Sequence, residues 1–383
     1  VGWSCASGCA SARKAEVDMA RRPPRGRLVR LDHVSRVLAD NPLDDPHERG
    51  LEVWLPPGYD QARGRGLGRR YPVLFSLAAY TNSGPGQTSW RAFGENLPAR
   101  LERLIGQGAM APCIVVFPDC FTSFGGNQYV NSSAIGRYAD YLTRELIPFV
   151  DAELRTRSAR EHRGCFGKSS GGYGALVHAM KYSRFWGAVA SHSGDCGFDL
   201  LYRPDWPGAL DTLARYRRGR RSEGPLDVTA FARHAADGFD DGRIRRFLGA
   251  LAGKDRPTGT EVLCLMMLGM SATYDPDPDA PNGFRVPVNL DTGELILARW
   301  RRWLRHDPIR LAKRHANALQ SMKKIFIDCG WRDQYRMHYG NRQLSARLRQ
   351  CRVSHVYEEF DGTHSGIDHR LDVSLPILSK ALQ

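Results

Sequence analysis

Near the start of the chain, hydrophobic and polar positions alternate. Leu51, Val53 and Leu55 are apolar at every second position, and the run stops at a Pro-Pro-Gly turn. A period of two is typical of strands that bury one face. The pattern therefore predicts early antiparallel strands within residues 27–40 and 50–56.

The pattern then changes to short, nearly continuous apolar runs separated by segments with helical spacing. Continuous apolar runs are typical of strands that are buried on both faces of a parallel sheet. Strands are predicted at 71–80, 113–117, 162–166, 185–191, 324–329 and 353–360, and helices at 91–107, 134–154, 170–182 and 373–382. Strands alternating with helices predict an α/β fold with a mostly parallel central sheet and helices on both faces.

This alternation is interrupted between residues 197 and 320, where Pro-rich turns and Arg clusters replace it. We therefore expect a large cap-like insertion at 197–320 within one α/β domain, whose core is formed by 27–196 and 321–383. Residues 1–26 are small, polar and basic, without the long apolar stretch of a signal peptide. They are predicted to form a poorly ordered leader.

Composition narrows the choice of partners and compartment. The net charge is +14, but most of the basic residues are scattered among acidic residues. We therefore expect no nucleic-acid partner. No run of 18 apolar residues occurs, so no membrane span is predicted. The cysteine count is nine, an odd number, and no C-x-x-C pair is present. This usage suits a reducing compartment, so a cytoplasmic location is expected.

The sharpest chemical signal is Gly167-Lys168-Ser169-Ser170-Gly171, which fits the G-x-S-x-G nucleophile elbow. An apolar strand precedes it and a helix-forming run follows, as that turn requires. A phosphate-binding loop would need a glycine at position 162, which is His, and an unspecialised Gly/Ser loop is the other alternative. Ser169 is therefore the candidate nucleophile.

A serine nucleophile needs a base and an acidic residue that orients it, and this fold places them in the order Ser, acid, His. Asp333 and His364 both follow predicted strands, in glycine-containing turns. The carboxyl edge of the sheet is where α/β sites form. Asp195 is a rival acid, Asp328 is more typical of a structural residue within a strand, and His369 is a less favoured base.

The remaining parts of the expected site are less sharply defined. The Ser170 amide at a helix N-terminus and a backbone amide at Ala79 or Tyr80 are candidate oxyanion donors. The aromatic residues expected to line the substrate pocket are Trp90, Tyr129 and Trp331. No zinc-type spacing, EF-hand loop or dinucleotide fingerprint is present, so no cofactor and no metal are predicted.

Taken together, these motifs resemble the esterase D-like and enterochelin esterase-like branch of the α/β-hydrolases, known as the "Putative esterase" family, and bacterial enterochelin-esterase-like members in particular. The resemblance rests on residues 55–59, 71–74, 115–119, 163–175, 328–333 and 362–364. It implies a Ser169–His364–Asp333 triad and an oxyanion hole made by the Ser170 and Tyr80 amides. Where S-formylglutathione hydrolases usually have His and Met around the serine, this chain has Lys168 and Ser170.

The expected activity is hydrolysis of a small-molecule carboxylic ester through an acyl-enzyme. Two alternatives remain: an acyltransferase that uses the same triad, and a non-catalytic binding protein on a hydrolase scaffold. The sequence leaves open whether the chain forms a homo-oligomer.

Overall fold

The computed structural model describes residues 25–61, 68–218 and 240–383. The predicted leader, residues 1–26, lies outside these ranges except for its last two residues. Within them, eight strands form one sheet in the order β1-β2-β4-β3-β7-β8-β9-β10. In that order their bounds are Arg27–Val34, Glu48–Leu55, Ile114–Phe117, Val73–Leu77, Arg163–Lys168, Ala188–His192, Lys324–Gly330 and Val356–Phe360.

Strand direction divides the sheet into two parts. β1 pairs with β2, and β2 with β4, in antiparallel fashion. From β4 to β10 every neighbouring pair is parallel. The strands from β4 to β10 therefore end at one common edge, where the loops after β3, β7, β8, β9 and β10 come together.

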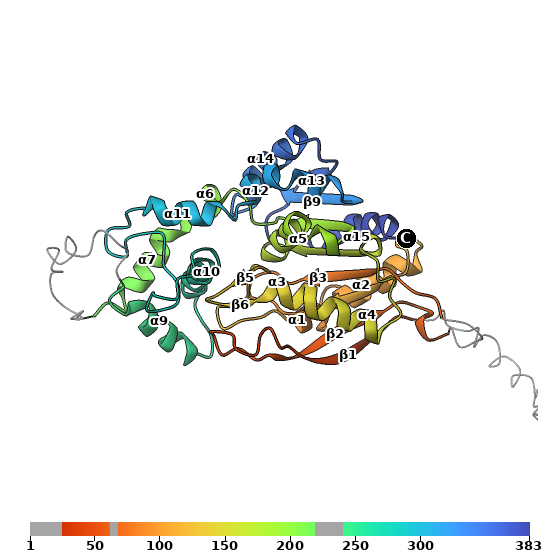
Figure 1. Cartoon of the computed structure of the whole chain (residues 1–383), viewed down its shortest axis with the longest axis horizontal. Helices are drawn as coiled ribbons and strands as arrows, with labels where there is room; N and C mark the ends of the chain where they lie inside the picture. The colour runs from red at the N-terminus through yellow and green to blue at the C-terminus, as the bar shows by residue number, and fades with distance from the viewer. Residues whose placement is uncertain (1–24, 62–67, 219–239) are drawn as a thin grey trace, which may run out of the picture.

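Successive residues of the central strands point to opposite faces of the sheet and build two hydrophobic cores. In β3, Phe75 packs in one core and Leu74 in the other. The Leu74 side is covered by α2 (Leu97–Gly106) and α15 (Leu371–Ala381). The Phe75 side is covered by α3 (Tyr138–Asp140), η2 (Tyr141–Leu146), α4 (Ile147–Glu153), α5 (Ser170–Lys181) and α14 (Met337–Gln350). Helices thus lie on both faces, as the sequence predicts (Figure 1).

The helix expected at 134–154 begins only at Tyr138. Residues before it form a small hairpin of β5 (Asn131–Ser132) and β6 (Gly136–Arg137), and Gly136 has a φ of 143° that suits glycine. The segment η2 is a π-helix, not an α-helix. It precedes Pro148, which has no N–H to donate to the preceding turn. Helical periodicity alone did not reveal either interruption.

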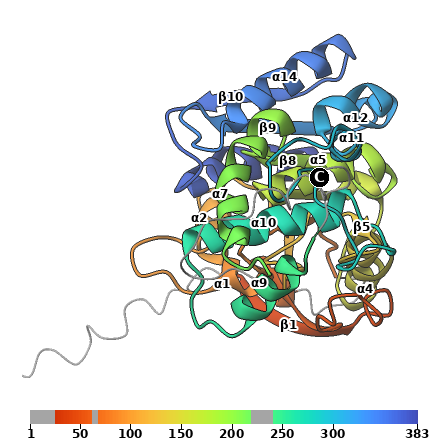
Figure 2. The same cartoon turned by 90° about the vertical axis from the view of Figure 1, so that its left-hand side faces the viewer.

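Between β8 and β9 the chain contributes helices and no strand to the sheet within the described residues. These helices are α6 (Phe198–Leu201), α7 (Trp206–Ala214), α9 (Arg243–Ala252), α10 (Gly259–Tyr274), α11 (Leu297–Leu304), α12 (Pro308–Arg314) and α13 (Ala316–Gln320). Helices α7, α9, α10 and α11 gather at one end of the sheet, and α12 lies closer to α5 (Figures 1 and 2).

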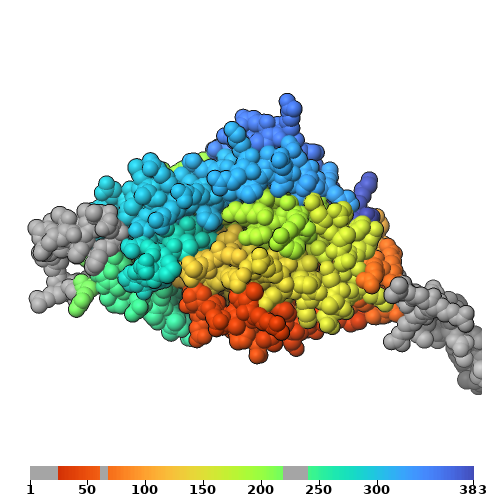
Figure 3. All heavy atoms as spheres, viewed as in Figure 1, coloured from red at the N-terminus to blue at the C-terminus, as the bar shows by residue number. Residues whose placement is uncertain are grey.

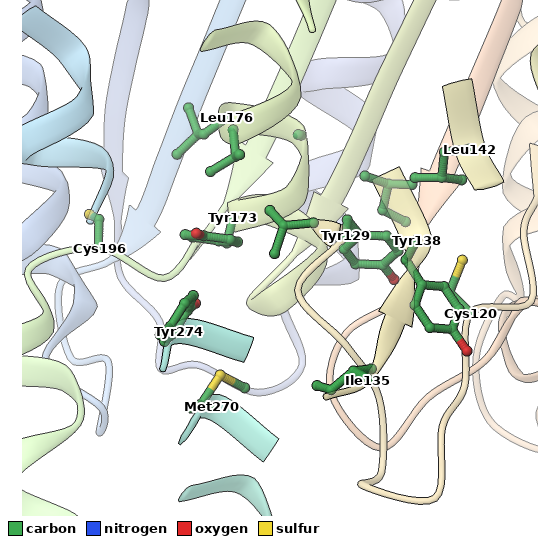
Figure 4. Packing of buried hydrophobic residues seen from close by; sticks show 14 of the residues in the cluster. Cys120, Tyr129, Ile135, Tyr138, Leu142, Tyr173, Leu176, Cys196, Met270 and Tyr274 are labelled. Atoms are coloured by element: carbon green, nitrogen blue, oxygen red, sulfur yellow. The ribbon is translucent and has the colours of Figure 1, made fainter. Parts of the chain in front are cut away.

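An aromatic cluster joins these helices to the core. The Tyr173 ring, on α5, lies 6.0 Å from that of Tyr274 and 6.1 Å from that of Phe198. The Trp303 ring on α11 lies 5.4 Å from that of Tyr274 (Figure 4 shows the Tyr173–Tyr274 contact). The Tyr173–Tyr274 and Tyr274–Trp303 pairs are edge-to-face, a geometry that contributes about 1 kcal/mol per pair beyond simple burial. The described part of the inserted segment is thus packed against α5, and in the space-filling view its teal and light-blue atoms adjoin the green and yellow atoms of the core segment (Figure 3).

In the part of the chain that the structure describes, no helix is both long and apolar enough to cross a membrane.

Candidate active site

Ser169 occupies a sharp bend between β7 and α5. Its backbone has φ 56° and ψ −123°, a combination that a residue with a Cβ adopts only under strain of about 1–3 kcal/mol. Two backbone hydrogen bonds stabilise the bend: Ser169 N donates to the His192 carbonyl over 2.9 Å, and Tyr173 N donates to the Ser169 carbonyl over 2.8 Å. The serine is therefore fixed by its neighbours at the carboxyl edge of the sheet.

The glycines on either side of Ser169 allow the strand and the helix to approach each other. A Cβ on Gly167 or on Gly171 would collide with the backbone carbonyl of Leu77, on β3. Because a backbone carbonyl in the centre of a sheet cannot move aside, only glycine fits at either position. This close packing is the physical basis of the G-x-S-x-G pattern.

Asp333 and His364 meet at the same edge, from the loops after β9 and β10. His364 Nδ1 lies 2.8 Å from Asp333 Oδ2, and both side chains are almost fully buried. The Tyr335 amide donates to Asp333 Oδ1 over 2.8 Å, and the His364 amide donates to Gln334 Oε1 over 2.9 Å. The pair is thus held in place by its own two loops.

The charge state of Asp333 follows from these contacts. Burial alone raises the pKa of a carboxyl group, and it does so here. The hydrogen bond and charge of His364, together with backbone amides, act in the opposite direction and prevail, so the pKa of Asp333 is held below its usual value. Asp333 is therefore an anion at neutral pH, next to the ring of His364.

One cavity, which we call the serine cavity, brings the predicted residues together. It has a volume of about 260 Å³, and its lining includes Ser169, Ser170, Tyr80 and His364. Among the described residues, neither Ser169 Oγ nor His364 Nε2 has a hydrogen-bond partner, so neither atom is committed to another group. Residues of α10 form an apolar wall: Val262, Leu263 and Met266.

The rival residues have other contacts. Asp328, inside β9, lies 2.7 Å from His192 Nδ1 and accepts a hydrogen bond from Arg370 Nε over 2.8 Å. His369 is exposed, and its ring lies 3.3 Å from the Gly366 carbonyl. These contacts leave Asp333 as the carboxylate bonded to His364.

Asp195 lines the serine cavity without bonding to His364. It accepts hydrogen bonds from Tyr202 Oη over 2.9 Å and from Gln128 Nε2 over 3.2 Å, and Oδ1 has no partner in the described structure. Burial raises the pKa of Asp195 to about 6. Sequence reasoning considered Asp195 only as a triad member and missed Gln128 and Tyr202, because no motif links these three positions.

The three predicted pocket aromatics lie elsewhere. Trp90 is 82% exposed and Trp331 is 50% exposed, and neither lines the serine cavity. Tyr129 is buried in the core, and its hydroxyl donates to the Ala78 carbonyl over 2.6 Å. Tyr129 therefore lies in the core and stabilises the chain just after β3. The residues that do line the cavity come largely from α10 and the loops around Tyr202 and Tyr335.

A second Ser–His–Asp set lies deeper in the same structure. His192 Nδ1 faces Asp328, and His192 Nε2 lies 2.9 Å from Ser374 Oγ, on α15. All three side chains are almost completely buried. In this set every polar group is hydrogen bonded, and Ser374 lies within a regular helix.

Comparison with known proteins places this geometry in a family. The family model described as "Putative esterase" matches residues 46–372. Esterase Rv1288 of Mycobacterium tuberculosis is 33% identical over 151 residues, which cover 38% of this chain and 29% of that protein. The match thus spans less than a third of the length of this curated relative.

Solved structures show the same fold at low sequence identity. A ferulic acid esterase is 17% identical, with a TM-score of 0.57 over 94% of this chain and 100% of that one. FphF, a fluorophosphonate-binding serine hydrolase of Staphylococcus aureus, is 14% identical, with a TM-score of 0.54 over 93% and 99% of the two chains. The predicted α/β-hydrolase fold is confirmed, and the chain belongs to the "Putative esterase" family.

Proposed function

We propose that this protein is a serine esterase that hydrolyses carboxylic esters through an acyl-enzyme. The observation that carries the proposal is the Asp333–His364 pair, whose His364 lines the same cavity as the strained Ser169. Membership of the esterase family supports the same reaction class. If the Asp333–His364 pair had only a structural role, it would not need a neighbouring serine with a strained backbone and an Oγ free of hydrogen bonds.

In the proposed reaction, His364 Nε2 accepts the Ser169 proton while Oγ attacks the ester carbonyl carbon. The imidazolium then gives that proton to the departing alcohol, which leaves an acyl group on Ser169. Water, deprotonated by His364, attacks the acyl-enzyme; the bond from the acyl carbon to Oγ breaks, His364 returns the proton to Ser169 Oγ, and the acid is released. The hydrogen bond to Asp333 fixes the His364 tautomer, and the carboxylate stabilises the imidazolium.

The proposed oxyanion hole consists of the backbone amides of Ser170 and Tyr80. Ser170 is the first residue of α5, so its N–H is one of those that a helix leaves without an internal acceptor. No hydrogen bond from the Tyr80 amide is present within the described residues, and Tyr80 itself is anchored by a 2.7 Å bond from Oη to the Phe124 carbonyl. Two such fixed donors stabilise the charge that develops on the carbonyl oxygen.

We further propose that residues 197–320 act as a cap that selects the substrate. Helix α10 contributes an apolar wall to the serine cavity, and the aromatic cluster around Tyr274 packs that helix against α5. An apolar wall favours esters with a hydrocarbon portion that can lie against it. The packing indicates a fixed wall whose shape limits the size of that portion.

The cysteines support the proposal of a reducing, cytoplasmic compartment. In the described part of the chain seven cysteines are free, and all but Cys351 are buried. Buried thiols without partners behave as small hydrophobic side chains.

A fluorophosphonate probe and an ester panel test the proposed function. The probe is expected to label one site, which mass spectrometry of peptides locates at Ser169. 4-Nitrophenyl esters of two to twelve carbons should be cleaved, with a maximum set by the α10 wall. Added methanol separates hydrolysis from acyl transfer, because a transferase would form mainly methyl ester. Absence of both labelling and cleavage would overturn the proposal.

A further inference from the structure

A second cavity lies beside the elbow, on the Leu74 side of the sheet; we call it the lysine cavity. It has a volume of about 210 Å³. One wall is the segment after β3, including Ala79 and Asn82, and another is the segment after His364, including Gly366 and Asp368. The cavity therefore lies between the loop that supplies the proposed oxyanion donor and the loop that supplies the proposed base.

Lys168 belongs to both cavities. It is the last residue of β7, and strand alternation places its side chain on the same face as Phe166, towards α2 and α15. Lys168 lines the lysine cavity together with Phe166, and it also lines the serine cavity together with Ser169. Lys168 is therefore the residue that the two cavities share, and it directly precedes Ser169 in the chain.

The other charged groups of the lysine cavity are already neutralised by partners. Arg91 pairs with Asp368, and Arg100 pairs with Asp372 and lies 3.6 Å from Glu95. His192 is bonded to Asp328 and Ser374, as described above. Lys168, which is half-buried, has no hydrogen bond and no ion pair among the described residues. Lys168 is therefore a positive charge in this cavity without a direct ion-pair partner among the described residues.

The surroundings of Lys168 do not favour an isolated ammonium group. Burial lowers the pKa of Lys168, and the charge of Arg91 acts in the same direction. Asp368 and Asp333 oppose this shift without overcoming it. An anion bound in the lysine cavity would restore the balance by pairing with the ammonium group where water is partly excluded.

We propose that Lys168 is a specificity-determining residue, which binds a carboxylate carried by the ester substrate in the lysine cavity beside Ser169. This inference rests on the proposed esterase function and deepens it, because it names the substrate class as anionic esters. The carboxylate belongs either to the acyl part or to the alcohol part of the ester, and the experiment separates the two.

The test measures kcat/KM for two matched pairs of esters at low ionic strength. For the alcohol side, 4-carboxyphenyl acetate is compared with 4-carbamoylphenyl acetate. For the acyl side, the monophenyl ester of adipic acid is compared with phenyl hexanoate. In at least one pair, we expect the wild-type protein to prefer the anionic ester by about tenfold, the effect of one charge-assisted contact in a partly exposed site.

Three variants decide the origin of that preference. Lys168→Met should lower the anionic-to-neutral ratio about tenfold, whereas Lys168→Arg should retain most of it. Lys380→Gln, which removes one exposed positive charge on α15, should leave the ratio unchanged. Lys168→Gln serves if the Met variant does not fold. The preference should also weaken in 0.5 M salt.

The outcomes distinguish this inference from the proposed function. If no ester is cleaved through Ser169, the esterase proposal fails and this one fails with it. If neutral esters are cleaved but the wild type prefers neither anionic ester, only this inference is overturned. The same conclusion follows if a preference exists and Lys168→Met leaves it intact in both pairs.

Discussion

Two His–Asp pairs among the described residues, each accompanied by a serine, have similar His–Asp distances and different surroundings. In one set, His364 is bonded to Asp333 over 2.8 Å, and Ser169 Oγ faces no competing partner. In the other, His192 lies 2.7 Å from Asp328 and 2.9 Å from Ser374 Oγ. Only the second set is fully hydrogen bonded.

The difference shows that the residue types alone do not make a reactive serine. Ser374 lies in the first turn of α15, without the strained backbone of Ser169, and its hydroxyl is hydrogen bonded to His192. It is also completely buried, so no ester can reach it. Ser169 has a strained backbone, an open cavity and adjacent amides. Access to the hydroxyl and backbone conformation therefore separate a candidate catalytic set from a structural one.

The largest expected effect comes from removing each serine in turn. Ser169→Ala should lower kcat/KM for a 4-nitrophenyl ester by at least about 10³-fold, because the nucleophile is lost. Ser374→Ala should leave fluorophosphonate labelling of Ser169 intact and cost about 1 kcal/mol of stability, since it removes one buried hydrogen bond. Initial rates and urea unfolding measure the two effects. An active Ser169→Ala protein would refute the assignment of the nucleophile.

Exchanging the two aspartates for asparagine should separate catalysis from stability. Asp333→Asn should reduce kcat about 10³- to 10⁴-fold, because an amide can hold the wrong His364 tautomer. Asp328→Asn should destabilise the fold by about 3–5 kcal/mol, because Arg370 and His192 lose a buried anionic partner. Single-turnover kinetics and thermal unfolding give the two readouts. The comparison breaks down if Asp328→Asn inactivates the protein without destabilising it.

Much of the sheet and the elbow could be predicted because their signals are local. A strand buried on both faces needs a continuous apolar run, and the bend at Ser169 needs Gly167 and Gly171. The positions of Asp333 and His364, each in a turn after a strand and in the chain order Ser, acid, His, follow from the fold. Each of these features depends on a few residues, and few other residue types would fit at those positions.

The parts that were missed depend on contacts between distant segments. Helix α14 (Met337–Gln350) is rich in Arg, Gln and His, and its buried residues include Leu344 and Leu348, so its apolar face gives a weak pattern. Trp90 and Trp331 are exposed, although large aromatics usually line pockets or fill cores. The apolar wall of the serine cavity comes instead from α10, which lies in the 197–320 segment, where the alternation of strands and helices is interrupted.

Asp195 extends the comparison to a third buried carboxyl group. Burial raises its pKa from 3.8 to about 6, against the hydrogen bonds of Tyr202 and Gln128 and the charge of His364, and with a contribution from Asp333. The folded state therefore prefers the protonated form. Stability that depends on this proton is fully present below pH 3.8 and is lost as the pH rises through 6.

Asp195→Asn removes this ionisable group. The free energy of unfolding of the variant should therefore rise relative to that of the wild type as the pH rises. The gain between pH 4 and pH 8 is on the order of 3 kcal/mol, as the shift in pKa implies. Urea unfolding of both proteins at several pH values measures it, and Asp199→Asn, an exposed aspartate on α6, is the control. A stability difference that does not change with pH would show that Asp195 is already ionised at pH 4.

The smallest effects concern the glycines that make one serine site possible. Gly171→Ala introduces a Cβ against the Leu77 carbonyl and should cost about 1–3 kcal/mol, because neither β3 nor α5 can move freely. Gly249→Ala is the matched change within α9, where a Cβ meets no atom, and it should gain about 0.5–1 kcal/mol from helix propensity. Urea unfolding measures both values.

If the two substitutions had equal effects, the close approach of β3 and α5 could not be what holds Ser169 in its bend. Because Ser374 needs no such bend, its contacts should survive Gly171→Ala in the folded protein, while fluorophosphonate labelling of Ser169 slows.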